Sequence, residues 1–223
     1  MSDSHFLRPQ PFWENLRFYQ KADVLYQLTY AFTRRYLTHG DRTIDQMVQA
    51  ARSGKQNIVE GSADGVTSTE MEIRLLNVAR ASIKELREDY EDYLNTRSLR
   101  WNSSHPRYGA MIEYTKTHNK ASDYARYISE GTDEEMANLA LTLSHQVDVM
   151  MTKYLQHLEK KFVEEGGIKE RMTAARIGRR QTQNETIATQ AGEITSLKAR
   201  IQQLENELKR YKVAETLRES PNP

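Results

Sequence analysis

The feature that most constrains the fold is a seven-residue repeat of apolar side chains towards the C-terminal end of the sequence. The first core position of the repeat holds Ile187, Ile194, Ile201 and Leu208, and the second holds Gln190, Leu197, Leu204 and Tyr211. Helices with such a repeat bury it against one another, and isoleucine at the first position with leucine at the second favours a parallel pair. We therefore expect residues 187–213 to form a parallel coiled coil. The oligomerisation residues predicted are Ile187, Ile194, Leu197, Ile201, Leu204, Leu208 and Tyr211.

Charged residues beside this repeat support the same pairing. In a parallel, in-register pair of helices, the contacts between flanking positions are Glu193 with Lys198, Arg200 with Glu205, and Glu207 with Lys212. Each exposed pair contributes only about 0 to 1 kcal/mol, but together they select an orientation. A single solvated helix would leave the apolar repeat exposed, and docking onto another protein is the remaining alternative.

The N-terminal three quarters of the sequence has the periodicity of long amphipathic helices. Apolar residues spaced three and four apart predict helices over 12–37, 43–60 and 67–98, and over 132–165, with a weaker, tyrosine-rich helical connection at 108–129. Helix starts are indicated by capping-box spacings at Thr67/Glu70 and Thr132/Glu135, and Gly61 is expected to cap a C-terminus with positive φ. Four such helices bury their apolar faces best as an antiparallel bundle.

The predicted organisation is therefore all-α, with an antiparallel four-helix bundle followed by a parallel coiled-coil helix. The boundaries expected are a bundle at 12–165, a basic linker at 166–186, the coiled coil at 187–213 and a disordered tail at 214–223. Gly166 and Gly167 end the last helix of the bundle.

Two segments of the second and third helices, residues 46–61 and 76–86, resemble a bacterial four-helix-bundle family. It includes proteins encoded in 23S rRNA intervening sequences and the accessory variability proteins of diversity-generating retroelements. The sequence departs from the family at Val59, where alanine is usual, and at Gly54, where a larger apolar residue is usual, and its region 101–130 is longer. The resemblance implies an oligomerising bundle without known catalysis. The retroelement relatives form rings that bind reverse transcriptase and nucleic acid.

Nothing in the sequence predicts an enzyme. It has no cysteine, and none of its six histidines has a glutamate three residues before it, so the Glu-x-x-His pattern of di-iron bundles is missing. Nucleophile-elbow, phosphate-loop and dinucleotide-binding patterns are also absent. His145 and His157 are expected as polar members of a helix surface or groove, and Ser53 and Ser82 at a close contact between helices. We predict a non-enzymatic cytoplasmic protein with no metal, no cofactor and no membrane span.

Three groups of cations are candidates for contacts with nucleic acid. Residues 1–165 carry 21 Lys and Arg against 24 Asp and Glu, whereas residues 166–223 carry 11 against 7. Arg80, Lys84 and Arg87 face Glu88 and Glu91 along one helix, so pairing within the helix explains that group. The remaining candidates are Arg34, Arg35, Arg42, Arg52 and Lys55 in the bundle, and Lys169, Arg171, Arg176, Arg179 and Arg180 in the linker.

These patterns predict a homo-oligomeric accessory or scaffold protein associated with RNA or DNA, with a reverse transcriptase or another protein as its partner. The alternative is an adaptor that binds only protein and whose basic linker serves as a flexible joint.

Overall fold

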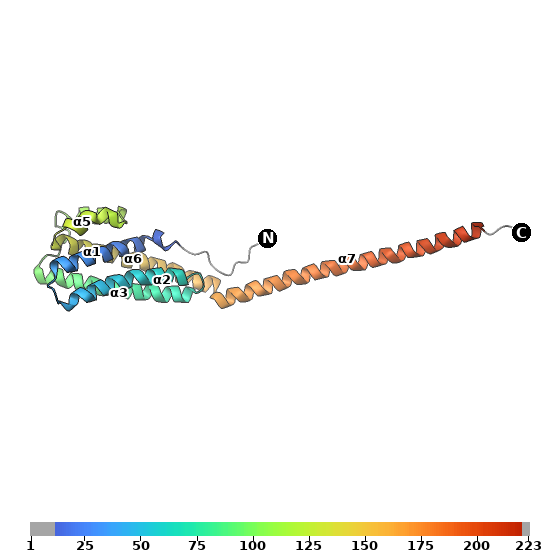
Figure 1. Ribbon diagram of the computed structural model, residues 1–223, viewed down its shortest axis with the longest axis horizontal. Coiled ribbons are helices and arrows are strands. Elements are labelled where there is room, and N and C mark those ends of the chain that lie inside the picture. The colour runs from blue at the N-terminus through green and yellow to red at the C-terminus, as the bar shows by residue number, and fades with distance from the viewer. Residues whose placement is uncertain (1–11, 220–223) are drawn as a thin grey trace. The chain divides into compact units, whose positions relative to one another are not determined.

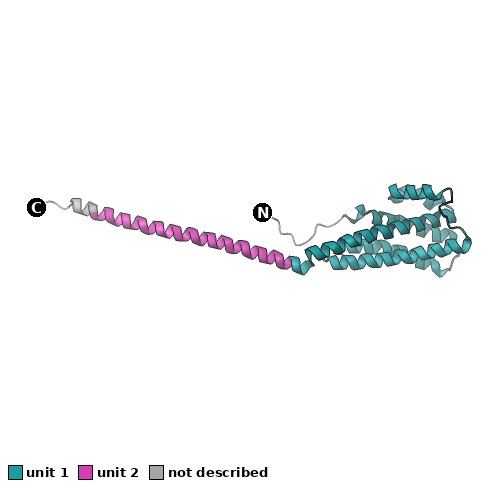
Figure 2. Ribbon diagram, turned by 180° about the vertical axis from the view of Figure 1, so that it is seen from behind, with its two compact units in different colours: residues 1–171 teal, residues 172–223 magenta. Residues whose placement is uncertain are grey.

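A computed structural model describes the backbone of residues 12–219 and the side chains of residues 12–213, and within this range the chain is helical without strands. A 3₁₀ turn at Trp13–Asn15 precedes α1 (Arg17–Tyr36), α2 (Arg42–Asp64) and α3 (Thr69–Arg97). Then follow α4 (Tyr108–Thr117), a 3₁₀ turn (Ala121–Tyr124), α5 (Ala125–Glu130), α6 (Asp133–Glu165) and α7 (Ile168–Glu219). The all-α prediction is confirmed. The chain divides into two compact units after Arg171, and each is described by itself (Figure 2).

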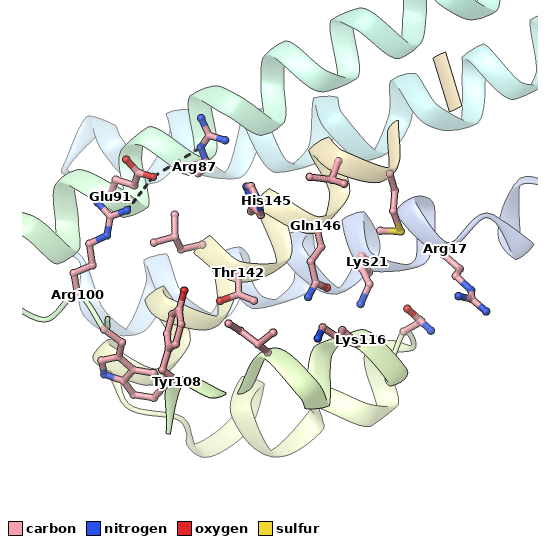
Figure 3. A pocket seen from close by; sticks show the side chains of 16 residues that line it. Arg17, Lys21, Arg87, Glu91, Arg100, Tyr108, Lys116, Thr142, His145 and Gln146 are labelled. Carbon is pink, nitrogen blue, oxygen red and sulfur yellow. Dashed lines mark ion pairs between the residues drawn. The ribbon is translucent and has the colours of Figure 1, made fainter. Parts of the chain in front are cut away.

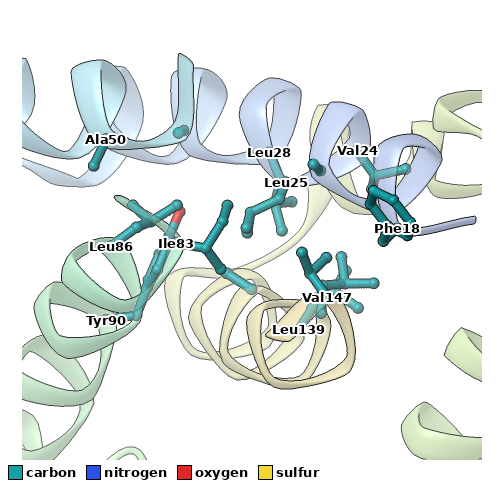
Figure 4. Packing of buried hydrophobic residues seen from close by; sticks show 14 of the residues in the cluster. Phe18, Val24, Leu25, Leu28, Ala50, Ile83, Leu86, Tyr90, Leu139 and Val147 are labelled. Atoms are coloured by element: carbon teal, nitrogen blue, oxygen red, sulfur yellow. The ribbon is translucent and has the colours of Figure 1, made fainter. Parts of the chain in front are cut away.

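The first unit is built on four long helices that lie lengthwise beside one another (Figure 1). Helix α2 packs on α1 and α3, and α6 packs on the same two helices. The side chains between them are fully buried, and Figure 4 shows Leu25, Leu28, Ile83, Leu86, Tyr90, Leu139 and Val147 in this cluster. Burying one such large apolar side chain contributes about 1.5 to 3 kcal/mol, so this cluster is the main source of the unit's stability.

Small residues bring α2 and α3 close together. The Ser53 and Ser82 hydroxyls are hydrogen-bonded at 3.0 Å, and a Cβ atom on Gly54 would lie 2.6 Å from Cδ1 of Ile83. The prediction that Gly61 caps a C-terminus with positive φ is wrong, because α2 continues to Asp64. A Cβ on Gly61 would lie 3.3 Å from that of Leu75, so this glycine serves the same close approach.

Of the two predicted capping boxes, the one at the start of α6 is found and the one at the start of α3 is not. Thr132 and Glu135 form the predicted capping box, each side chain bonded to the other's backbone N–H at 3.2 Å. At the start of α3 the cap is Ser68, whose hydroxyl accepts from the N–H of Met71, and the Thr67 hydroxyl instead donates to the Asp64 carbonyl. The predicted box at Thr67/Glu70 is therefore wrong, and a single cap one residue later, at Ser68, starts the helix.

The segment between α3 and α6 is anchored by one buried asparagine. Ser98, with φ of 57°, ends α3 and turns the chain towards Trp101, which is buried. The Asn138 side chain on α6 accepts from the Trp101 N–H at 2.8 Å and donates to the Leu99 carbonyl at 2.9 Å. Because these bonds satisfy buried backbone groups, they fix where the following helices α4 and α5 can lie.

Helix α7 is a single helix from Ile168 to Glu219 (Figure 1). Gly166, with φ of 71°, separates it from α6. Most of the segment expected to be a linker, 166–186, therefore belongs to the same helix as the seven-residue repeat, and a flexible joint is absent from residues 168–186. The helix also includes residues 214–219 of the expected disordered tail, and residues 220–223 lie outside the described residues.

Candidate functional site

The predicted oligomerisation face of α7 is exposed along its whole length. The seven side chains from Ile187 to Tyr211 are between 47% and 75% exposed. Around them, every side chain described from residue 181 to residue 213 is exposed as well. An apolar stripe of this length on a solvated helix is typical of a surface that binds another helix.

Three arginines form a basic stripe on α7 just before the repeat. Arg176, Arg179 and Arg180 are exposed and are spaced three and four apart, so they share one helix face. The other two predicted residues of this group lie in the first unit. Lys169 is exposed there, whereas Arg171 is half-buried and its Nε and Nη2 atoms are buried without a hydrogen-bond partner. Arg171 is therefore poorly placed to reach a phosphate in solvent.

The basic stripe continues the register of the apolar repeat. Arg180 lies seven residues before Ile187 and therefore occupies the first core position of the repeat. Arg176 lies seven residues before Gln183, which itself lies seven before Gln190, so Arg176 occupies the second core position. The same helix face is therefore apolar from Ile187 onwards and cationic before it.

The predicted cation group of α1 and α2 is largely engaged within the protein. Arg35 donates to the Gly131 and Ile128 carbonyls at 3.2 and 2.6 Å, and Lys55 pairs with Asp23 at 3.1 Å. The Arg34 guanidinium lies 4.2 Å from the ring centre of Tyr30. Arg42 and Arg52 are exposed, ten residues apart on α2. Contact of these five residues with phosphate therefore stays a prediction, with Arg35 and Lys55 already engaged in internal contacts.

The other polar residues weighed in the sequence have structural contacts. Arg80 pairs with Asp148 on α6 at 2.9 Å rather than along its own helix, and Arg87 lies 3.9 Å from Glu91 as predicted.

A pocket of about 610 Å³ lies over the outer face of α6 (Figure 3). Helix α4 forms one wall through Tyr108, Ile112 and Lys116. Its other sides are lined by Arg87 and Glu91 of α3 and by Arg17 and Lys21 of α1. From α6 come Leu141, Thr142, His145, Gln146, Val149 and Met150. The remaining lining residues are Arg100, Trp101 and Asn119.

The charged groups of the pocket are mostly cationic. Five Lys and Arg side chains line it against one carboxylate, that of Glu91. Glu91 lies between two of the arginines, 3.9 Å from Arg87 and 3.7 Å from Arg100, as the dashed lines in Figure 3 show. Lys116 pairs with Glu113 on its own helix at 2.5 Å. An anion entering the pocket would therefore meet a net positive field.

Lys21 is the most enclosed of these cations, with 3% of its surface exposed. Its ammonium donates to the carbonyls of Thr115 and, at 3.2 Å, of His118, so it joins α1 to the end of α4. Burial, with a smaller effect of the nearby Arg17 charge, lowers the pKa of Lys21 to about 8. No carboxylate bonds to this ammonium among the described residues.

Three polar atoms of the pocket residues lack a hydrogen bond within the described chain, namely Arg87 Nε, Asn119 Oδ1 and Gln146 Oε1. They have almost no accessible surface, so they are enclosed by the protein and are not open to the pocket. Arg87 Nε lies 3.9 Å from its ion-pair partner, the Glu91 carboxylate.

No direct signal for this pocket is present in the sequence. Its residues come from four helices and two loops, and no single segment contains a recognisable motif. The one related observation was the unusual length of residues 101–130, because this stretch supplies Trp101, Tyr108, Ile112, Lys116 and Asn119.

Within residues 12–213, no group of three or more His, Asp and Glu side chains is placed to hold a metal ion. No helix in the described part of the chain has both the length and the apolarity to cross a membrane. Comparison of the chain with known protein families, with curated proteins and with solved structures finds no match.

Proposed function

We propose that this chain is a non-enzymatic, oligomeric scaffold protein that holds nucleic acid through paired α7 helices. In this proposal α1, α2, α3 and α6 form an antiparallel four-helix bundle, and α7 pairs in parallel with the α7 of a second copy. The observation that carries the proposal is the continuous register of α7, in which one helix face is apolar over 187–211 and cationic over 176–180.

The flanking charges favour a second copy in parallel orientation. In register, the parallel pair places Glu193 against Lys198, Arg200 against Glu205, and Glu207 against Lys212. The fully overlapped antiparallel pair instead places Glu193 against Glu207, and it places Arg200 and Lys198 each against its own copy. These charged contacts are attractive in the first arrangement and repulsive in the second.

The basic stripe explains why this pair would attract a polyanion. Continued pairing beyond Ile187 would bring Arg176 and Arg180 of both copies into the core, where like charges repel strongly. The two helices would therefore be separated on the N-terminal side of residue 181. Their arginines would face each other across the gap. Phosphates in that gap neutralise the repulsion, and the released counterions make binding salt-dependent.

The resemblance to the retroelement accessory proteins adds a reverse transcriptase as the protein partner of this scaffold. The second candidate function is a protein-only adaptor that pairs through the same helix. It is favoured by the internal contacts of Arg35 and Lys55, which reduce the cations that the first unit offers to phosphate.

The direct test is the salt dependence of nucleic-acid binding by the wild-type chain and by R176Q/R179Q/R180Q. The three substitutions keep the helix polar and leave the apolar repeat intact. The slope of log affinity against log salt should fall by about 3 if one helix of the pair contacts the nucleic acid, and by about 5 if both do.

A matched control removes three exposed cations of the first unit, in R74Q/R126Q/K153Q. This control should keep the wild-type slope, because the net charge changes equally but α7 does not. Binding of wild type and the α7 variant with the same slope would contradict the role of the basic stripe. Absence of binding by the wild type to either RNA or DNA would favour the protein-only adaptor.

A further inference from the structure

The cationic pocket of the first unit is separate from the surfaces used by the proposed scaffold function. Every residue that lines it falls between Arg17 and Met150, and α7 contributes none. The charges and the apolar side chains that line it therefore need an explanation independent of nucleic-acid binding by α7.

The pocket has two chemically different ends. Arg17, Lys21 and Lys116 lie at one end, where the Lys21 ammonium bonds to the Thr115 carbonyl beside Lys116 (Figure 3). At the other end Glu91 lies between Arg87 and Arg100, with Trp101 next along the chain. The first end offers cations alone, whereas the second offers donors and an acceptor together.

Apolar side chains line the space between the ends. Ile112 projects from α4, and Leu141 and Val149 come from α6. The volume of about 610 Å³ is far larger than an inorganic anion needs and lies within the range of small-molecule sites, about 300 to 1,000 Å³. A ligand that fits this pocket has an apolar or aromatic body and an anionic group.

We propose that this pocket binds a nucleoside phosphate. The phosphate lies between Arg17 and Lys116, the two exposed cations of the first end. The base occupies the apolar centre, with its polar edge towards Glu91 and Arg100. This ligand supplies an anion for the end that has cations alone, a flat body for the apolar lining, and a polar edge for the end that has donors and an acceptor.

The test is calorimetric titration of the full chain with AMP, adenosine and inorganic phosphate. AMP should bind at least tenfold more tightly than either of its parts, because only AMP fills both the cationic end and the apolar centre. No measurable binding of AMP, or equal affinity for AMP and inorganic phosphate, would overturn the proposal.

Two pocket variants locate the binding. R17Q/K116Q removes two cations whose side chains are exposed and should weaken AMP binding at least tenfold without changing adenosine binding. V149W fills the apolar centre and should weaken both, while circular dichroism checks that each variant is folded. R74Q/R126Q removes the same charge outside the pocket and should bind AMP as the wild type does.

The α7 variant R176Q/R179Q/R180Q should also bind AMP with wild-type affinity. This result separates the two proposals, since loss of salt-dependent nucleic-acid binding and loss of AMP binding are then caused by different substitutions. AMP binding that survives both R17Q/K116Q and V149W, or that is lost only in the α7 variant, would place the ligand elsewhere and overturn the pocket assignment.

Discussion

Lys21 shows how a single buried charge couples stability to pH. Its ammonium is held by backbone carbonyls in a nearly closed site, and burial lowers its pKa to about 8. In the unfolded chain a lysine has a pKa of about 10.4. Between these two values the unfolded chain binds more protons than the folded one, so the free energy of unfolding should rise with pH.

We predict that the wild-type chain gains about 1 to 2 kcal/mol of stability from Lys21 between pH 7.5 and 9.5. K21M removes the titrating group and should lack this gain, whereas K153M, at an exposed position of α6, should keep it. The measurement is denaturant unfolding at several pH values below the ordinary tyrosine pKa of about 10. Parallel pH profiles for wild type and K21M would contradict the assignment.

At the residue scale, the sequence predicted apolar burial well and polar burial poorly. Val24, Leu25, Leu28 and Phe32 follow the helical period of α1 and are all fully buried. Lys21 could not be recognised as buried, because the Thr115 and His118 carbonyls that satisfy it lie on a distant segment. Gly61 was assigned to a cap for the same reason, since its close contact with α3 depends on tertiary packing.

At the scale of the element, α7 allows its orientation to be tested by exchanging charges. E193K/E207K replaces attractive contacts with repulsive ones in the proposed parallel pair, and should raise the dissociation constant of the pair by about tenfold to a hundredfold. K198E/K212E should do the same. Sedimentation equilibrium at low salt measures the association.

The combined variant E193K/K198E/E207K/K212E provides the control, because it restores opposite charges at every parallel contact. Its dissociation constant should return towards the wild-type value, and the two double variants, when mixed, should pair with each other. A combined variant that associates as weakly as either double variant would exclude parallel pairing through these contacts.

Element boundaries were predictable where caps are local and less so where packing decides them. The start of α6 was located from Thr132 and Glu135 alone, because the capping box is a contact within four residues. The basic segment before Ile187 lacks an apolar period and was interpreted as a linker. It is helical because it continues a helix that has already begun at Ile168, with no glycine or proline between them until Gly178.

At the scale of the whole molecule, the protein has a compact helical unit and a helix whose apolar face has no partner within the described chain. The four long helices could be predicted from their periodicity, and the apolar stripe of α7 from its repeat, while the pairing of that stripe with another helix stays a prediction. The cationic pocket could not, since it forms only when the segment 98–132 folds back onto α6. The family resemblance allows rings, whereas the repeat of α7 favours pairs.

The most direct test of the central claim uses the absence of cysteine from the chain. L204C places one thiol at a core position of the repeat, where a parallel, in-register pair brings identical residues within the reach of a disulfide. N206C places one on the outer face two residues away. Under mild oxidation, L204C should convert to a covalent dimer on a non-reducing gel while N206C stays largely monomeric. Failure of L204C to cross-link, or equal cross-linking of both variants, would contradict the parallel pairing of α7.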